Sequence, residues 1–279
     1  MDNLAAANNW IRLRIGVYVF GIATVAAGIL DLIWGEFEAA HQPIQALSDH
    51  IPGVKILAYI AAVWLIVGGA AMMWPRTARF GAAAVAIIYG IFGAFLFPRF
   101  YTAPHFLGDR AAVFIGLFAA IGQQLILVVA ATIVYVSLGM RGSFPPLAAL
   151  ITRWIFGLCA VDFGVAHLTA VHAVAPMVPN WIPFGGDFWI VLTGIAFLLA
   201  GLAILSAILD VLASRLLALM LFVFSVLVLA PHIVSSPQNH VAWGGNAYNL
   251  AAVGATLIFA EWLAICRSSQ STQRKPSLA

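Results

Sequence analysis

Eight long apolar runs divide the chain, and most are close to the length that a helix needs to cross a membrane. The runs cover residues 15–34, 56–74, 80–98, 111–135, 154–171, 188–205, 216–231 and 247–266. A helix requires about 20 residues to cross the hydrocarbon core of a bilayer. The runs are apolar on every face, whereas the strands of a membrane barrel alternate apolar and polar positions. The pattern therefore predicts an all-α polytopic membrane protein with eight transmembrane helices.

The composition agrees with this prediction. Hydrophobic residues make up 63% of the 279 residues and charged residues only 8%, whereas soluble domains carry about 25% charged residues. Mean hydropathy is +1.03, so the lipid bilayer is the expected partner of the outer surface. The net charge of +3 is small and the basic residues form no patch, so no nucleic-acid partner is expected. Cys159 and Cys266 have no CxxC partner and are interpreted as small buried side chains.

The basic residues predict the orientation of the helices. All but three of the 13 Lys and Arg residues fall on one side of the predicted spans, the exceptions being Lys55, Arg99 and Arg110. The positive-inside rule then places both termini in the cytoplasm, in a multi-pass protein of the inner (plasma) membrane. The first run is too long for a signal peptide and is expected to be retained. Residues 268–279 are polar and are expected to form a disordered cytoplasmic tail.

The two halves of the chain share an ordered set of positions, which indicates an internal repeat. In the first apolar run of each half, Gly21, Thr24, Gly28 and Asp31 correspond to Gly157, Ala160, Gly164 and His167. Further matches follow in the same order: residues 51–52 with 182–183, Ala61 and Gly68 with Gly194 and Gly201, residues 77–79 with 213–215, and Pro98 with Pro231. Because each half has an even number of helices, both halves are expected to have the same orientation. The sequence thus predicts two tandem parallel four-helix repeats, residues 1–140 and 141–267.

An ionisable residue ends each glycine stripe, at Asp31 in the first half and at His167 in the second. The glycines themselves predict close helix packing. Pseudo-symmetry would bring Asp31 and His167 together near the outer end of the bundle, where His172 and His232 also fall. These residues are interpreted either as interfacial groups that reach water or as a proton relay or ligand site. A metal site is the weakest alternative, because no HxxxH or HExxH spacing is present.

Asp162 lies near the middle of the fifth run, where a charge costs several kcal/mol. Gln123, Gln124 and Thr193 are candidate partners from other helices. A structural hydrogen bond and a substrate-binding role are both open for Asp162. Asp210 falls at an inner turn, where the sequence assigns it no special role.

The second half resembles a known family of small membrane proteins. Phe163-Gly-Val-Ala-His167 is followed by Val178-Pro-Asn-Trp-Ile-Pro183, then by Gly194, Gly201 and Pro231. This order is similar to the DoxX-like family, whose unit is a four-helix bundle. The resemblance covers residues 154–266 well. The first half departs from the pattern, since Asp31 stands where the family has a histidine.

The resemblance implies several functions. Some relatives are membrane subunits linked to thiosulfate oxidation that pass electrons to quinone, and others belong to oxidative-stress complexes or act in membrane-protein biogenesis. A quinone-linked oxidoreductase subunit is therefore one hypothesis. The sequence has no haem, flavin or iron–sulfur signature, so no intrinsic cofactor is expected, and electrons would come from a soluble or membrane redox partner. The alternatives are a transporter or binding protein for a small apolar or weakly acidic solute, and a non-catalytic assembly subunit.

Overall fold

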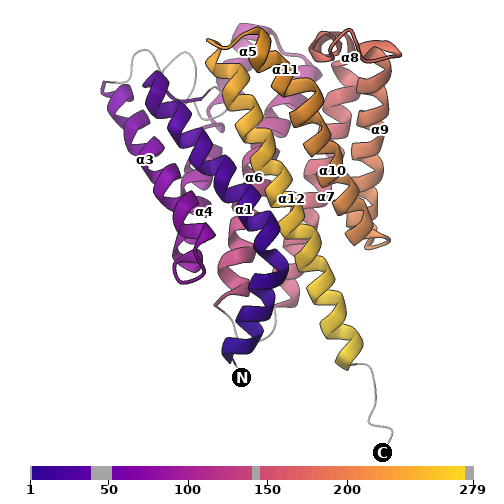
Figure 1. The fold of residues 1–279 in the computed structure, drawn as a ribbon. Helices are drawn as coiled ribbons and strands as arrows, with labels where there is room; N and C mark the ends of the chain where they lie inside the picture. Colours follow the sequence, from indigo (N-terminus) through magenta and orange to yellow (C-terminus); the bar gives the residue numbers. More distant parts are fainter. Residues whose placement is uncertain (1, 39–51, 140–144, 274–279) are drawn as a thin grey trace, which may run out of the picture.

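The described part of the chain is entirely helical. The computed structural model describes residues 2–38, 52–139 and 145–273 and contains no strand within them. Its helices are α1 (Asp2–Trp34), α3 (Val54–Met73), α4 (Ala78–Ala94), α5 (Arg99–Leu107), α6 (Ala111–Ser137), α7 (Pro146–Thr169), α8 (Val171–Val174), η1 (Ala175–Met177), α9 (Gly185–Ser206), α10 (Asp210–Phe224), η2 (Ser225–Leu229), α11 (Ala230–Ser235) and α12 (His240–Gln273) (Figure 1). The predicted fold class is therefore confirmed at the level of an all-helical protein.

Seven segments are individually long and apolar enough to cross a membrane. An eighth arises if α4 and α5, which meet at a bend of 44°, are counted as one span. Large apolar side chains such as Ile15, Phe80 and Leu199 remain exposed on the outside of the bundle, as lipid-facing residues do. The beginning of α1 and the end of α12 lie at the same end of the bundle (Figure 1), which fits an even number of crossings. We refer to this end as the terminal end and to the opposite one as the distal end.

Several helices extend beyond the predicted runs. α1 begins at Asp2, and the Asn9 side chain donates a hydrogen bond to the Ser137 carbonyl at the end of α6 (3.2 Å). α5 forms between the predicted runs 80–98 and 111–135, where the sequence predicted no helix. α12 continues through Gln273, past the predicted start of the disordered tail. These additional turns are more polar than the apolar runs, so hydropathy alone does not mark where the helices begin and end.

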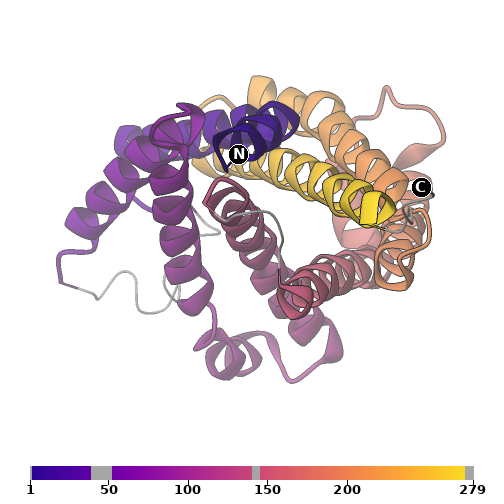
Figure 2. The same ribbon diagram turned by 90° about the horizontal axis from the view of Figure 1, so that it is seen from below.

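Helix neighbours follow the order of the chain within each half. α1, α3, α4 and α6, which we term the first unit, pack in sequence, and α7, α9, α10 and α12, the second unit, do the same. The circle closes where α6 packs on α7 and α12 packs on α1, and α6 also contacts α12 in the centre. Seen from the terminal end, α12 runs beside α1 (Figure 2). α6 and α12 are therefore shared walls between the two units.

The glycine stripes bring these helices into contact, as the sequence predicted. A methyl group on Gly28 would lie 2.5 Å from the Ala62 carbonyl oxygen of α3. On Gly164 a methyl group would lie 2.8 Å from the Gly194 carbonyl oxygen of α9. In lipid, such backbone contact is a principal source of helix association. The prediction of close packing by glycine is confirmed.

Gly254 gives a direct test of this packing. A methyl group at Gly254 of α12 would collide with the backbone of Phe20 in α1, which cannot move aside as a flexible side chain can. We expect Gly254→Ala to lower the free energy of unfolding by about 1–3 kcal/mol, measured by equilibrium unfolding in mixed detergents. Gly245→Ala, on the same helix with open space around it, is the control and should cost nothing. Equal effects of the two substitutions would contradict the proposed contact.

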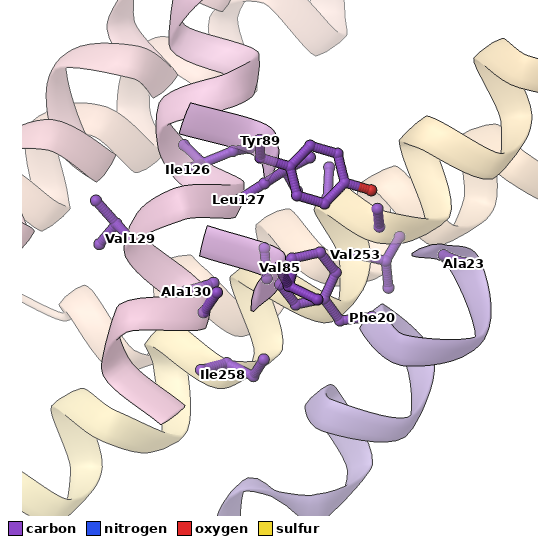
Figure 3. Close-up of a cluster of buried hydrophobic side chains, with 14 of the residues drawn as sticks. Phe20, Ala23, Val85, Tyr89, Ile126, Leu127, Val129, Ala130, Val253 and Ile258 are labelled. Atoms are coloured by element: carbon purple, nitrogen blue, oxygen red, sulfur yellow. The ribbon is translucent and has the colours of Figure 1, made fainter. Parts of the chain in front are cut away.

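Aromatic side chains fill the interior of the first unit. Phe20 and Tyr89 stack with their ring centroids 6.0 Å apart, and Phe92 meets Tyr89 edge-on at 6.0 Å. Figure 3 shows Phe20 and Tyr89 among apolar side chains from α6 and α12, including Leu127 and Val253. Each buried aromatic side chain removes a large apolar surface from its surroundings. The first unit is therefore well packed around this cluster.

A buried ion-pair network joins three helices at the terminal end. Asp210, fully buried at the start of α10, pairs with Arg153 of α7 and with Arg267 of α12 (2.5 Å). The two guanidinium groups also donate to the Ile204 and Ala207 carbonyls at the end of α9, at 3.2 and 2.9 Å. The interpretation of Asp210 as an unremarkable turn residue was therefore wrong, because the sequence does not reveal that two arginines from distant helices converge on it.

Candidate functional site

A cavity of about 400 Å³ lies between the helices of the second unit and α6. We term it the central cavity. Its walls come from α6, α7, η1, α9, α10, η2 and α12, with Glu38 after α1, and they are largely apolar, including Phe156, Phe163, Phe197 and Phe224. Its volume falls within the range of small-molecule sites, which are typically about 300–1,000 Å³. The second unit thus has room for a ligand between its helices.

His167 contributes an imidazole to this cavity. Its Nδ1 lies 2.8 Å from the carbonyl oxygen of Phe163, one turn earlier in α7. A carbonyl oxygen only accepts hydrogen bonds, so Nδ1 carries the hydrogen, and in the neutral ring Nε2 is an acceptor. The imidazole lies against Phe197, with ring centroids 5.0 Å apart. His167 therefore has a fixed ring with one nitrogen left for a ligand.

Further polar groups of the cavity come from α12. The Asn249 amide donates to the Leu221 carbonyl (2.7 Å) and to the Ser225 hydroxyl (2.8 Å), at the junction of α10 and η2. These bonds use both amide hydrogens, so the oxygen is the atom that Asn249 can offer to a ligand. Tyr248 and Thr256 line the same cavity. A ligand with both apolar surface and a polar head fits this arrangement.

A second polar group, which we term the distal cluster, consists of Asp31, Trp34, Glu36 and His240. His240 Nε2 lies 3.7 Å from Asp31 Oδ1, and His240 Nδ1 lies 3.1 Å from Glu36 Oε1. The Trp34 ring stacks on the imidazole at 4.7 Å, with 5° between the planes. Asp31 and His240 are buried, with 0% and 8% of their side-chain surfaces exposed, whereas Glu36 is 57% exposed. The cluster therefore reaches from the surface to a buried carboxylate.

The end of α1 shapes the distal cluster. Gly35 adopts φ +66° and donates its backbone N–H to the Asp31 carbonyl (2.9 Å), a common way for a helix to end. The chain then turns back, and the Glu38 N–H donates to Asp31 Oδ1 (3.0 Å). The Glu38 side chain is buried and lines the central cavity. Glu38 therefore connects the distal cluster with the central cavity.

The structure separates the two residues that pseudo-symmetry was expected to pair. Asp31 interacts with His240 and Glu38, and His167 bonds to Phe163. The expected Asp31–His167 pair was therefore wrong. The last apolar run was predicted to begin at residue 247, but α12 starts at His240. This earlier start brings His240 to the end of α1.

The remaining predicted site residues lie outside the central cavity. His172 pairs with Asp187 at 3.5 Å, and both side chains are largely exposed. His232 is exposed on α11. Asp162 is partly buried, and its Oδ2 makes no hydrogen bond to any residue that the structure describes. The hydroxyl of Thr193, a proposed partner, donates instead to the Trp189 carbonyl at 2.7 Å. Of the five predicted residues, His167 alone lines the cavity.

Sequence reasoning missed His240, Glu38 and Asn249. His240 falls between the predicted runs 216–231 and 247–266, and Glu38 falls between the runs 15–34 and 56–74, so neither was assigned to a helix. Asn249 is a polar residue within an apolar run, which was the available signal, because a polar side chain in a membrane span usually faces the protein interior. Ile51 of the repeat, and the ionisable residues His41, Asp49 and His50 between the first two predicted runs, lie outside the described residues.

The part of the chain that the structure describes contains no candidate metal site. Within residues 2–38, 52–139 and 145–273, no three His, Cys, Asp or Glu side chains form a group that could hold a metal ion. Both cysteines are free thiols, with Cys159 buried against the cavity.

No family model, curated protein or solved structure matches this chain.

Proposed function

We propose that this chain is a membrane protein that binds a quinone-like molecule in the central cavity, as the membrane subunit of a quinone-linked oxidoreductase. The observation that carries the proposal is the cavity itself, about 400 Å³ among membrane-spanning helices and lined by His167, Tyr248 and Asn249. The resemblance to DoxX-like proteins supports the choice of ligand. The helices are long and apolar enough for an integral membrane protein.

The residues of the cavity fit a quinone head group. His167 Nε2 can accept a hydrogen bond from a hydroquinone hydroxyl and hold the proton at that nitrogen. The aromatic walls, including Phe163 and Phe197, provide flat apolar surface for a ring. A bound quinone would supply two-electron chemistry, and the electrons would come from a redox partner. The role of this chain would be to bind the head group, exclude water and receive a proton at His167.

The proposal extends to the architecture. We propose that the two units are tandem parallel repeats, supported by the similar order of helix neighbours and by paired glycine contacts. The glycine contacts between helices favour Ala62 and Gly69 as the counterparts of Gly194 and Gly201. The sequence comparison had instead matched Ala61 and Gly68 to these two glycines, one position earlier. Likewise, the helix starts align Ala78 with Asp210. Both termini lie at the terminal end of the bundle, and most of the basic residues are predicted to lie on that side. By the positive-inside rule, this supports cytoplasmic termini in an inner membrane.

Replacement of His167 tests the ligand proposal. His167→Phe keeps an aromatic ring of similar size but removes both nitrogens. We expect it to weaken quinone binding about tenfold, the effect of losing one hydrogen bond worth about 1.4 kcal/mol. Binding would be followed by saturable quenching of tryptophan fluorescence in detergent-purified protein, and quinone in the purified sample by mass spectrometry.

His172→Phe is the matched control, because this histidine is exposed and lies outside the cavity. It should leave quinone affinity unchanged. The absence of both co-purified quinone and saturable binding in the wild-type protein would overturn the proposal. Uptake of a water-soluble solute into proteoliposomes would then favour the transporter alternative.

A further inference from the structure

We infer that the ligand enters the central cavity sideways from the membrane, through a second pocket between α9 and the α10–η2 segment, and that its apolar chain stays in that pocket. This inference rests on the proposed function. It defines the ligand class more narrowly, as an amphiphile with a polar head and a long apolar chain.

The second pocket, which we term the lateral pocket, has a volume of about 230 Å³. Its walls are apolar side chains of α9, α10 and η2 and of the segment from α8 to Ile182, such as Ile190, Val228 and Val178. Thr193 also lines it, but its hydroxyl donates to the carbonyl of Trp189 in its own helix (2.7 Å). Because the Thr193 hydroxyl is hydrogen-bonded within its own helix, it adds little polarity to the wall of the pocket. The lateral pocket therefore suits a hydrocarbon chain.

The lateral pocket opens towards the outside of the bundle. Val223 and Leu227 line it, and each keeps 39% of its surface exposed. Both belong to the α10–η2 segment, which is part of the stretch Asp210–Ser235, long and apolar enough to cross a membrane. In a membrane, the exposed parts of these side chains face lipid. A molecule dissolved in the bilayer can therefore reach the pocket without passing through water.

The two pockets share one boundary. His167, Met177, Phe224 and Leu229 line both the central cavity and the lateral pocket. Met177 is an unbranched side chain that changes rotamer easily, and Phe224 lies at the end of α10, where the helix changes to the wider η2 turn. A passage between the pockets thus needs side-chain rotation, without displacement of a whole helix.

The position of His167 determines how a ligand would lie. A chain in the lateral pocket places the head group past His167, next to Asn249 and Tyr248 of the central cavity. The polar groups that can recognise a head line the central cavity. In the lateral pocket, Thr193 and Trp189 donate their hydrogens to backbone carbonyls, so His167 is the polar side chain of that pocket available to a ligand. This division matches a long-chain quinone and does not match a small hydrophilic solute.

A bulky substitution in the lateral pocket tests the inference. Val228→Trp would fill the pocket, and Val226→Trp is its control, because Val226 is in the same η2 turn, is exposed and lines neither pocket. Affinities would be measured for a quinone with a long alkyl chain and for the same quinone without a chain. We expect Val228→Trp to weaken binding of the long-chain quinone about tenfold or more and to leave the chainless quinone unchanged. Val226→Trp should change neither.

Unchanged affinity of Val228→Trp for the long-chain quinone would overturn the lateral route. Failure of the wild-type protein to bind either quinone would instead overturn the proposed function, so the two failures are distinguishable. If Val228→Trp does not fold, Thr193→Phe fills the same pocket from α9 and gives the same comparison. A photoreactive group at the end of the alkyl chain should label α9 or η2, and labelling confined to α3 or α4 would also count against the route.

Discussion

Asp210→Ala is expected to lower the free energy of unfolding by about 1.5–3 kcal/mol, because it removes a fully buried carboxylate that accepts charged hydrogen bonds from two partly exposed arginines. The substitution leaves the Arg153 and Arg267 guanidinium groups without their shared carboxylate. It also removes a negative charge from the first turn of α10, where the helix dipole favours one. Equilibrium unfolding of the purified protein in mixed detergents, followed by circular dichroism, would measure the loss.

The Arg215–Glu261 pair provides the control at the same end of the bundle. Its shortest distance is 2.6 Å, but both side chains are partly exposed. Ion pairs that contact water contribute about 0–1 kcal/mol, so Glu261→Ala should have a small effect. If Asp210→Ala were no more destabilising than Glu261→Ala, the network would not join α7, α10 and α12 as described.

His240→Ala is expected to cost about 3 kcal/mol of unfolding free energy, because it leaves the buried Asp31 carboxylate without its imidazole partner. The substitution also removes the ring that stacks on Trp34. The same unfolding measurement would report the effect. His232→Ala is the matched control, since that side chain is exposed near the same end, and it should change stability by less than about 0.5 kcal/mol.

A double-mutant cycle isolates the interaction between His240 and Asp31. Asp31→Asn removes the charge while keeping the shape of the side chain, so the double variant no longer has a buried charge without a partner. We expect the two substitutions together to cost less than the sum of their separate effects, with a coupling of about 1–3 kcal/mol. Strictly additive effects would mean that these side chains do not interact.

The helices could be predicted from the sequence because lipid imposes a strong and local requirement. Every backbone polar group must be satisfied within its own segment, so long apolar runs mark helices reliably. The same reasoning predicted that Gly28 and Gly164 bring helices together. It failed at α5 and at the polar start of α1, since helices outside the hydrocarbon core follow other requirements.

The candidate site was harder to predict, because its residues come from distant parts of the chain. His167 was found from its place at the end of a glycine stripe. The pairing of Asp31 with His240 depends on how α1 packs against α12, and hydropathy contains no information about that contact. Asp210 shows the same limitation, since its two arginine partners come from α7 and α12.

The η2 segment is a π-helix, and this has a consequence for the evolutionary history of the chain. A π-turn is what one inserted residue produces in an α-helix whose two ends are held in place. Gly69 contacts Gly21 in the first unit as Gly201 contacts Gly157 in the second, so Gly69 and Gly201 are equivalent positions. The number of residues from Pro98 to Pro231 is larger by one than the number from Gly69 to Gly201. If both units descend from one ancestral copy, the second gained a single residue between Gly201 and Pro231, the interval that contains η2. One added codon would then have distorted this helix beside a cavity, while the first copy kept an aromatic core.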